Sequence, residues 1–361
     1  MDSNYTYNFP AVKGIQAGAE YYVAMCPLKL IPKLFIFNED ELPPQYRAQR
    51  TINKSRIPEI TRYILNNPLD YVFSSLTASI DGQAEFCPIT DECPNIGSLV
   101  IDMDATFIIN DGQHRRAAIE EAIKSKPELG NETISVVFYK DQGLHRSQQM
   151  FADLNKHAIN TTKSIGILYD SRDEMAKVTK EVIDNVPLLA KFTDRENSSI
   201  SKYSAKLFTL SSVYDTNYQL IRKRKNITKK DISLMIAFWK TLSESIVEWK
   251  QVQEKELSAS NLRLSYIHTH GVVLEAFGML GHYLIINREK GWISYIAALD
   301  KLDWSRSNLA DWGGRVIRNN GNISKSRTNV LLTYIKIKKQ LNLSLTPEED
   351  EEEEKFIRGG Q

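Results

Sequence analysis

The first half of the chain combines short apolar runs with amphipathic segments, the pattern of a mixed α/β domain. Residues 97–110 alternate or run apolar and are rich in β-branched side chains, which predicts two short strands that meet near Asp104. Residues 134–139 predict a further strand. Residues 113–124 place alanine and isoleucine on one helical face, and residues 58–65 predict an earlier helix that begins with proline. We therefore expect a strand–turn–helix–strand unit.

The second half of the chain is almost entirely helical by the same criterion. Apolar positions recur at helical spacing, and breaks that contain Asn, Gly and Pro separate the segments. No segment repeats at a fixed period, which excludes a solenoid. The strongest predicted helices span residues 164–185, 228–256, 271–286 and 326–341.

The last fifteen residues differ from both halves because seven of them are acidic. Such a segment is too charged to bury, so we expect it to be disordered. The chain then divides into three regions. These are an α/β (α+β) N-terminal domain over residues 1–165, an all-α C-terminal domain over 166–346 and an acidic disordered tail over 347–361.

Composition excludes several protein classes. Of 361 residues, 42% are hydrophobic and 25% charged, which allows a sizeable core and excludes a collagenous, disulfide-scaffold or wholly disordered protein. No stretch approaches the ~18 consecutive apolar residues of a membrane span, and the N-terminus lacks a signal-peptide pattern. Because only three cysteines are present, we expect a reducing, cytoplasmic location without membrane contact.

Charge is segregated along the chain although the net charge is only +1. Without the acidic tail, the remainder has 44 basic and 38 acidic residues, a net charge of +6. Two blocks concentrate the positive charge. Residues 201–231 carry eight Lys or Arg against two acids, and residues 314–340 carry seven against none.

The sharpest local motif follows the second predicted strand and reads Asn110-Asp111-Gly112-Gln113-His114-Arg115-Arg116. Asp-Gly predicts a tight turn, and a helix then begins with a histidine and two arginines. Cations oppose the partial positive charge of a helix N-terminus, so this arrangement indicates a bound anion. Backbone N–H groups would surround a phosphate, and Arg115 would bind it in bidentate fashion. Arg116 would pair with Glu120 and face solvent. The alternative is a plain turn with surface cations.

Asp111-Gly112-Gln113-His114-Arg115 is also the motif that names the DGQHR-domain proteins. The surrounding chain resembles the DndB family of DNA sulfur modification proteins over most of residues 15–345. The resemblance implies an N-terminal domain with the ParB/sulfiredoxin-like fold, in which a Gly-x-Arg-Arg turn binds nucleotide phosphates. The supporting stretches are Tyr21 to Phe35, Arg56 to Ile60, Tyr71 to Phe73, Phe151 to Asn155, Asp303-Trp304 and Trp312 to Arg315.

The resemblance implies a phosphate or nucleotide site at this turn, with a nucleoside triphosphate and magnesium as the candidate cofactor. His114 stands where that turn has its first arginine, and neutral imidazole binds phosphate less strongly. Asn155 matches the asparagine of a second ParB element, but Leu154 and Ala158 replace its acid and arginine. Gln113 replaces the cysteine that sulfinic acid reduction needs, which excludes that chemistry. The candidate phosphate-binding residues are Asp111, Gly112, Gln113, His114, Arg115, Arg116 and Asn155.

The two basic blocks are the candidate DNA-binding surfaces. The first contains six cations within nine residues, and Thr228 can cap a helix that begins there, a favourable place for a DNA phosphate. Such blocks supply salt-dependent affinity with little sequence information, and a solvated surface is the alternative. The candidates are Arg222, Lys223, Arg224, Lys225, Lys229 and Lys230 in the first block, and Arg315, Arg318, Lys325 and Arg327 in the second.

The cysteines and histidines indicate little further chemistry. All three cysteines precede proline, but their spacing does not fit a metal site, so no metal is expected there. Cys26 lies near Lys29 and Lys33, which makes it a weak candidate for a DNA-facing thiol, with a small buried residue as the alternative. No carboxylate adjoins His268 and His270 in sequence, which favours a packing or capping role.

Together with the resemblance, these features favour a DNA-binding regulator of a DNA phosphorothioate modification system, which would repress transcription of the modification genes. Its partners would be double-stranded DNA at the nucleoid, other proteins of the system and further copies of the chain. The alternative is an ATPase or nuclease in which Arg115 binds phosphate, His114 acts as acid, base or electrophile, and Asn155 orients phosphate or metal. A third possibility is an interaction module that docks a modification enzyme.

Overall fold

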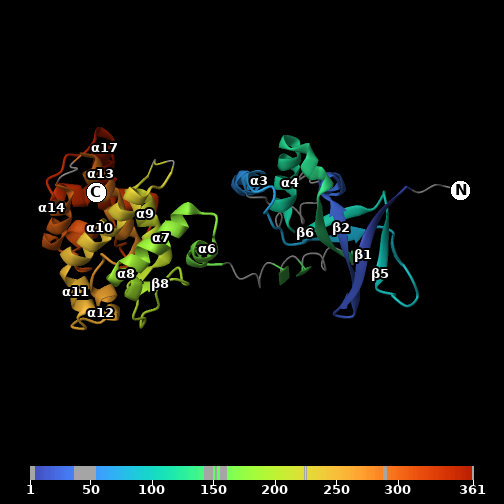
Figure 1. Ribbon diagram of the computed structural model, residues 1–361, viewed down its shortest axis with the longest axis horizontal. Coiled ribbons are helices and arrows are strands. Elements are labelled where there is room, and N and C mark those ends of the chain that lie inside the picture. The colour runs from blue at the N-terminus through green and yellow to red at the C-terminus, as the bar shows by residue number, and fades with distance from the viewer. Residues whose placement is uncertain are drawn as a thin grey trace. The chain divides into compact units, whose positions relative to one another are not determined.

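The computed structural model of the chain describes residues 5–35, 54–141, 149–150, 153–154, 161–222, 224, 226–287 and 291–359. The chain divides into two compact units, Met1–Ile159 and Asn160–Gln361, each with its own hydrophobic core. Figure 1 shows that the first unit contains the large sheet and that the second is helical. The expected mixed α/β architecture is confirmed at this level.

The first unit is built on a seven-stranded sheet with the strand order β4-β5-β1-β2-β7-β3-β6. Neighbouring strands are antiparallel except β3 and β7, which run parallel. The strands expected on both sides of Asp104 and at 134–139 are confirmed as β5, β6 and β7. The strands are β1 Thr6–Gln16, β2 Ala19–Pro27, β3 Leu76–Asp81, β4 Ala84–Pro88, β5 Ile96–Asp102, β6 Thr106–Asp111 and β7 Thr133–Lys140.

Helices cover one side of this sheet (Figure 1). The two longest, α3 and α4, pack against each other and are the helices expected at 58–65 and 113–124. Ala118 and Ile119 on the inner face of α4 join the same hydrophobic cluster as the inward-facing residues of the strands. The helices whose bounds lie within the described residues of this unit are η1 Leu28–Leu30, α1 Ile31–Leu34, η2 Lys54–Arg56, α3 Ile57–Asn66, α4 Gln113–Ser125 and η3 Pro127–Asn131.

The second unit contains helices and one small parallel sheet, β8 Thr193–Asp194 with β9 Phe208–Thr209, which departs from the all-α expectation. The helices expected at 271–286 and 326–341 are confirmed as α13 and α16. The helices are α6 Lys163–Tyr169, α7 Glu174–Asn185, α8 Pro187–Phe192, α9 Leu210–Leu220, α10 Lys229–Ser245, α11 Val247–Gln253, α12 Ala259–Ser265, α13 Gly271–Asn287, α14 Trp292–Ala297, η4 Ala298–Lys301, α15 Leu309–Trp312, α16 Arg327–Gln340 and α17 Pro347–Gly359.

Two predicted helices are each divided in two. The segment expected at 164–185 breaks before α7 because the Asp173 carboxylate accepts hydrogen bonds from the N–H groups of Met175 and Ala176, which caps a new helix. The segment expected at 228–256 breaks at Ile246, whose backbone is extended between α10 and α11. Capping residues therefore set boundaries that apolar periodicity alone does not show.

Helix α13 is apolar on nearly all sides and packs against α9 and α16 in the core of the second unit. Two glycines permit the close approach of α9. A Cβ atom at Gly278 would lie 2.4 Å from the carbonyl oxygen of Thr216, and one at Gly281 would lie 2.5 Å from Cδ1 of Leu220. Within the described ranges, no helix combines the length and apolar character needed to cross a membrane.

The acidic tail forms helix α17, so the expectation of disorder there is wrong. The Thr346 hydroxyl accepts a hydrogen bond from the Glu349 N–H at 3.3 Å, and the Glu349 carboxylate accepts one from the Thr346 N–H at 3.0 Å. This reciprocal pair is a capping box, and Pro347 follows it as the first helical residue. The acidic first turn is further stabilised by the positive end of the helix dipole.

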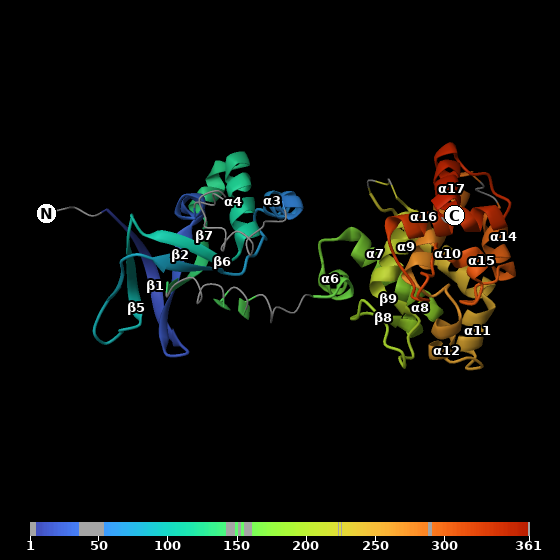
Figure 2. The same cartoon turned by 180° about the vertical axis from the view of Figure 1, so that it is seen from behind.

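Helix α17 docks on the second basic block through buried ion pairs. Glu353 accepts two hydrogen bonds from the Arg315 guanidinium, at 2.6 and 2.8 Å, and a third from Lys339 at 2.9 Å. Glu349 pairs with the fully buried ammonium of Lys338 at 2.6 Å. Figure 2 shows α16 and α17 beside each other. The tail thus binds its own chain and neutralises three cations of this block.

Two histidines lie in the second core in the packing role expected for them. Nδ1 of His268 accepts a hydrogen bond from the Trp249 indole at 2.9 Å, which places the proton on Nε2, 3.3 Å from the Glu248 carboxylate. Burial lowers the pKa of His268, although Glu248 opposes the shift. Burial, with a contribution from the charge of Arg306, lowers the pKa of His270 to about 4.

We expect the second unit to lose stability as the pH falls below about 6.5, because unfolding then lets both histidines bind protons that the folded state excludes. For His270 alone the loss between about pH 7 and pH 5 is roughly 2 kcal/mol. Urea unfolding followed by tryptophan fluorescence reports on this unit, since all five tryptophans lie in it. The variant His270→Gln should show a flatter pH profile, and equal slopes for both proteins would contradict the assignment.

The substitution Gly278→Ala should lower the free energy of unfolding by roughly 1–3 kcal/mol, because the new methyl group overlaps the Thr216 carbonyl of α9. The matched control is Gly166→Ala in α6, where a Cβ atom meets no atom within 4 Å. That variant should be neutral or more stable by about 0.5–1 kcal/mol. The same fluorescence measurement tests both, and an unchanged Gly278→Ala protein would show that α9 and α13 are less closely packed.

Candidate functional site

The motif at 111–116 folds as the sequence predicts. Strand β6 ends at Asp111 and α4 begins at Gln113. Gly112 between them has a φ angle of 102°, and a Cβ atom there would lie 2.4 Å from Cδ2 of Leu76. Both the left-handed backbone and the close packing require glycine. The turn thereby fixes the start of α4, with its first free N–H groups, at the edge of the sheet.

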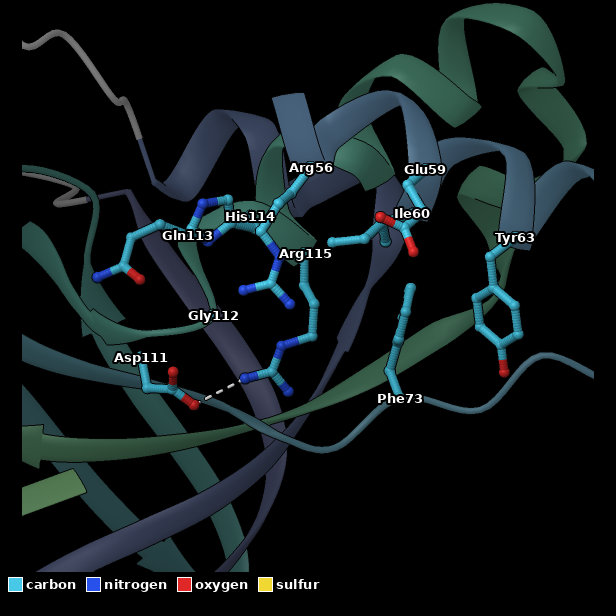
Figure 3. Close-up of a pocket in the computed structure, with 10 residues that line it drawn as sticks. All are labelled: Arg56, Glu59, Ile60, Tyr63, Phe73, Asp111, Gly112, Gln113, His114 and Arg115. Atoms are coloured by element: carbon cyan, nitrogen blue, oxygen red, sulfur yellow. Dashed lines mark hydrogen bonds and ion pairs between the residues drawn. The ribbon is translucent and has the colours of Figure 1, made fainter. Parts of the chain in front are cut away.

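A cavity of about 460 Å³ opens at this turn, between the starts of α3 and α4 (Figure 3). Arg56 and Glu59 line it from the η2–α3 segment, and His114 and Arg115 line it from α4. The cavity therefore combines a helix N-terminus with two arginines and a histidine, which is the arrangement of an anion site.

Aromatic and aliphatic side chains form the opposite wall of the cavity (Figure 3). The rings of Tyr63 and Phe73 lie 6.1 Å apart, and Ile60 lies beside them on α3. A flat apolar wall next to an anion site fits a ligand that joins a phosphate to a planar base.

Arg115 holds the rim of the cavity together. Its Nη1 donates to the carbonyl oxygens of Ser74 at 2.6 Å and Ser75 at 3.1 Å, and its Nη2 donates to the Asp111 carboxylate at 2.7 Å. These bonds join the segment before β3 to the first turn of α4. The expected bidentate contact with a phosphate would have to displace Asp111 from this guanidinium.

Arg116 points away from the cavity, and its inclusion in the phosphate site is corrected. It pairs with Glu120 at 2.5 Å as expected, but its side chain is only 12% exposed instead of facing solvent. Its guanidinium donates to the carbonyl oxygens of Phe35 at 2.9 Å and Pro32 at 3.1 Å. Arg116 therefore fastens α1 to α4.

His114 is neutral near pH 7. Burial lowers its pKa, the nearby charge of Arg56 lowers it further, and Asp111 opposes the shift. A neutral imidazole can accept a proton or donate a hydrogen bond, which suits a general base or an electrophile. Gln113 is buried beneath the turn.

Sequence reasoning missed five residues of this cavity as site residues: Arg56, Glu59, Ile60, Tyr63 and Phe73. They lie 38 to 55 positions before Asp111, in η2, in α3 and in the segment after α3. Tertiary packing, including that of α3 against α4, brings them to the motif. Asn155 lies outside the described residues, so its expected role stays a prediction. Among the residues that the structure describes, no three His, Cys, Asp or Glu side chains are grouped to hold a metal ion.

The first basic block is exposed at the start of α10. Its cap is the one expected, because Thr228 accepts from the Asp231 N–H and the Asp231 carboxylate accepts from the Thr228 N–H. Asp231 also pairs with Arg224. The exposed cations are Arg222, Arg224, Lys229 and Lys230, whereas Lys223 and Lys225 lie outside the described residues.

In the second basic block, two candidate DNA contacts are corrected. Arg315 is 6% exposed and is occupied by Glu353, so it is unavailable to a phosphate. Lys325 pairs with both Asp215 at 2.8 Å and Glu275 at 2.9 Å. Arg318 and Arg327 remain exposed.

Cys26 does not face DNA. Its thiol is fully buried because β2 alternates, with Tyr22, Ala24 and Cys26 all facing the core. Burial raises the pKa of this thiol to about 12, so it is unreactive near neutral pH. The alternative of a small buried residue is correct.

The chain thus combines an α/β unit that contains a cationic pocket with a helical unit that has exposed cations at the start of α10. The chain belongs to the DndB family: the family model described as "DNA-sulfur modification-associated" matches residues 9–344. Membership associates the chain with DNA sulfur modification. Comparisons with curated proteins and with solved structures gave no match. The ParB/sulfiredoxin-like fold therefore stays a prediction.

Proposed function

We propose that this protein is a DNA-binding regulator of a DNA sulfur modification system and that it represses transcription of the modification genes. Family membership supports the link to that system. The observation that carries the proposal is the exposed pair Lys229 and Lys230 in the first turn of the capped helix α10.

These two lysines are poorly placed unless an anion approaches them. The partial positive charge of the helix start repels them, and the nearest acid, Asp231, is already used by Thr228 and Arg224. Neither lysine has a carboxylate partner among the described residues. A DNA phosphate would bind both the lysines and the helix N-terminus at once.

The charge balance of the second basic block also supports the start of α10 as the DNA contact. Carboxylates already neutralise Arg315 and Lys325, so the start of α10 retains more uncompensated charge. Arg318 and Arg327 would extend the contact as exposed secondary cations. Phosphate contacts of this kind give affinity that falls steeply with salt. Preference for an operator then depends on base or shape readout.

The double variant Lys229→Ala/Lys230→Ala should weaken binding to duplex DNA and reduce the slope of log affinity against log salt by about 2. Fluorescence anisotropy measures this with a duplex from upstream of the protein's own operon and with a scrambled duplex. The matched control Lys240→Ala/Lys250→Ala removes the same charge from exposed positions elsewhere on α10 and α11 and should bind normally.

The proposal fails if the wild-type protein has no salt-sensitive affinity for duplex DNA. Equal affinity for the operator and scrambled duplexes would leave DNA binding but remove the repressor role. Equal effects of the two double variants would exclude the start of α10 as the contact.

A second candidate function is that of a nucleotide hydrolase or nuclease, and the cavity at Gly112 favours it. Arg56 and the start of α4 would bind phosphate, the aromatic wall would hold a base, and neutral His114 would act as general base. The carboxylates Glu59 and Asp111 could contact a magnesium ion that arrives with the phosphates.

For this second function, His114→Gln should reduce phosphate release from ATP and magnesium by about 100-fold or more while nucleotide binding persists. Arg56→Gln should instead weaken nucleotide binding. A malachite-green assay and calorimetry separate the two effects, with Lys124→Ala on the exposed side of α4 as the control. If the wild-type protein releases no phosphate above buffer and cleaves no DNA, the cavity is not a hydrolytic site.

A further inference from the structure

A second cavity, of about 500 Å³, opens within the second unit at the start of α13. Its lining comes from the 198–202 segment, the start of α9, α12, the residues around the first turn of α13, and the segment before α16. Basic side chains line it, whereas no described Asp or Glu does. The basic side chains are those of Lys202, Arg263, Arg306 and Lys325.

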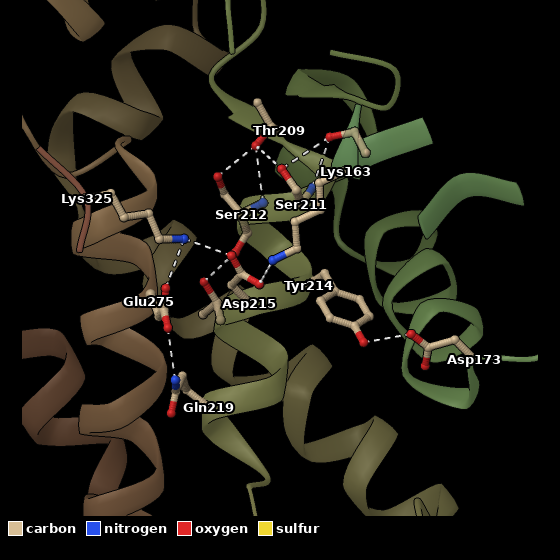
Figure 4. A network of polar contacts seen from close by, with 12 residues as sticks. Lys163, Asp173, Thr209, Ser211, Ser212, Tyr214, Asp215, Gln219, Glu275 and Lys325 are labelled. Atoms are coloured by element: carbon tan, nitrogen blue, oxygen red, sulfur yellow. Dashed lines mark hydrogen bonds and ion pairs between the residues drawn. The ribbon is translucent and has the colours of Figure 1, made fainter. Parts of the chain in front are cut away.

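Lys325 stands at the positive end of α13. Its ammonium forms ion pairs with the carboxylates of Asp215 and Glu275, as Figure 4 shows. Gly271, the first residue of α13, makes this approach possible. A Cβ atom there would lie 2.9 Å from the Ser212 hydroxyl and 3.6 Å from Lys325 Nζ. The absent side chain therefore lets the Ser212 hydroxyl and the Lys325 side chain pack directly against the start of α13.

Two arginines add positive charge that no described carboxylate offsets. Arg263 is 8% exposed and donates only to main-chain carbonyl oxygens, those of Ser201, Lys202, Ser204 and Lys206. Arg306 donates to the carbonyl oxygen of Gly321 at 3.0 Å. Besides burial, the charges of Arg306 and Arg263 contribute to the lowered pKa of His270, which lines the same cavity. The cavity is thus electropositive.

The same place holds polar groups without partners. Thr269 lines the cavity, is 5% exposed, and its hydroxyl makes no hydrogen bond to any described residue. The N–H groups of Gly271 and Val272, in the first turn of the 17-residue helix α13, likewise have no acceptor within the described part of the chain. The buried unpaired hydroxyl is unfavourable, and free N–H groups at a helix start attract anions, so their grouping beside cations indicates an anion that accepts from them.

We propose that this cavity binds the phosphate group of a small phosphate ester, such as a nucleoside phosphate. The phosphate lies against the start of α13, between Thr269 and Arg306, whereas Lys325 stays paired with Asp215 and Glu275 beside it. Leu207, Val272 and Ile323 give the cavity apolar walls for the organic part of the ligand. Its volume falls in the range of small-molecule sites, roughly 300–1,000 Å³. This site is separate from the cavity at Gly112 and does not depend on DNA binding.

Isothermal titration calorimetry of the full chain with AMP, inorganic phosphate and adenosine tests the proposal. AMP and phosphate should bind and adenosine should not, because the phosphate supplies the recognition. Arg306→Gln should weaken AMP binding about tenfold or more, and Thr269→Val should weaken it several-fold. Thr269→Val keeps the side-chain shape and removes only the unpartnered hydroxyl, so the fold should be preserved or slightly stabilised.

Two control variants locate the bound ligand. Arg327→Gln removes an exposed cation outside the cavity, and Lys124→Ala removes one from the exposed side of α4 in the first unit, so neither should change AMP binding. Arg56→Gln shows whether AMP binds in the cavity at Gly112 instead. The proposal is overturned if AMP and phosphate do not bind at millimolar concentration, if Arg306→Gln and Thr269→Val bind AMP normally, or if only Arg56→Gln loses affinity. It is also overturned if the two cavity variants weaken duplex DNA binding alone, since the phosphate would then belong to DNA.

Discussion

The ion pair between Arg315 and Glu353 is the contact on which the distribution of charge in the second unit depends. Both side chains are nearly buried, and removing either partner would leave an isolated charge in the protein interior, which is strongly unfavourable. The pair draws α17 onto α16 and brings Glu349 to Lys338. Three cations that look available in the sequence are thereby compensated. The candidate DNA surface consequently shifts to the start of α10.

Local patterns account for what the sequence predicts correctly. Strand alternation around Asp104, the helix after Gly112 and the cap at Thr228 all depend on neighbours within a few positions. The motif-bearing turn belongs to this group, so the core of the candidate site could be predicted. One local signal also predicts the helix in the tail, because the Thr-Pro-Glu-Glu sequence at 346–349 is a capping box. The expectation of disorder rested on the net acidity of the tail and did not take this signal into account.

Side chains with distant partners could not be placed from the sequence. Arg116 was expected in solvent, but it binds carbonyl groups 81 and 84 positions earlier in the chain. Arg315 meets its carboxylate 38 positions later, and Lys325 meets Asp215 110 positions earlier. Arg56 was not expected in the candidate site for the same reason, because tertiary packing brings it there from a distant part of the sequence. A basic block read from sequence therefore overstates the charge that remains free after folding.

In each of the two cavities, one arginine uses its donors to fix the rim and leaves ligand contact to other side chains. Arg115 donates hydrogen bonds to the Ser74 and Ser75 carbonyl oxygens, and Arg263 donates to carbonyl oxygens of the loop at 201–206. Each keeps its positive charge but has few donors left for a ligand. Less constrained cations, Arg56 in one cavity and Arg306 in the other, are better placed to bind directly. In each cavity, one arginine therefore sets the shape of the rim and adds positive potential, and a second arginine is the one placed to contact the ligand.

The enclosed ammonium of Lys338 has a practical consequence for work with shortened chains. It lies 3.9 Å from the centre of the Tyr283 ring, and the carboxylate of Glu349 is its counterion among the described residues. The family match ends at residue 344, which makes that position a natural place to end a recombinant fragment. A fragment that ends there would leave the buried ammonium of Lys338 and the buried guanidinium of Arg315 without their carboxylate partners. The last turns of the chain are therefore part of the folding unit, and protein trimmed at the family boundary is a poor starting material for binding assays.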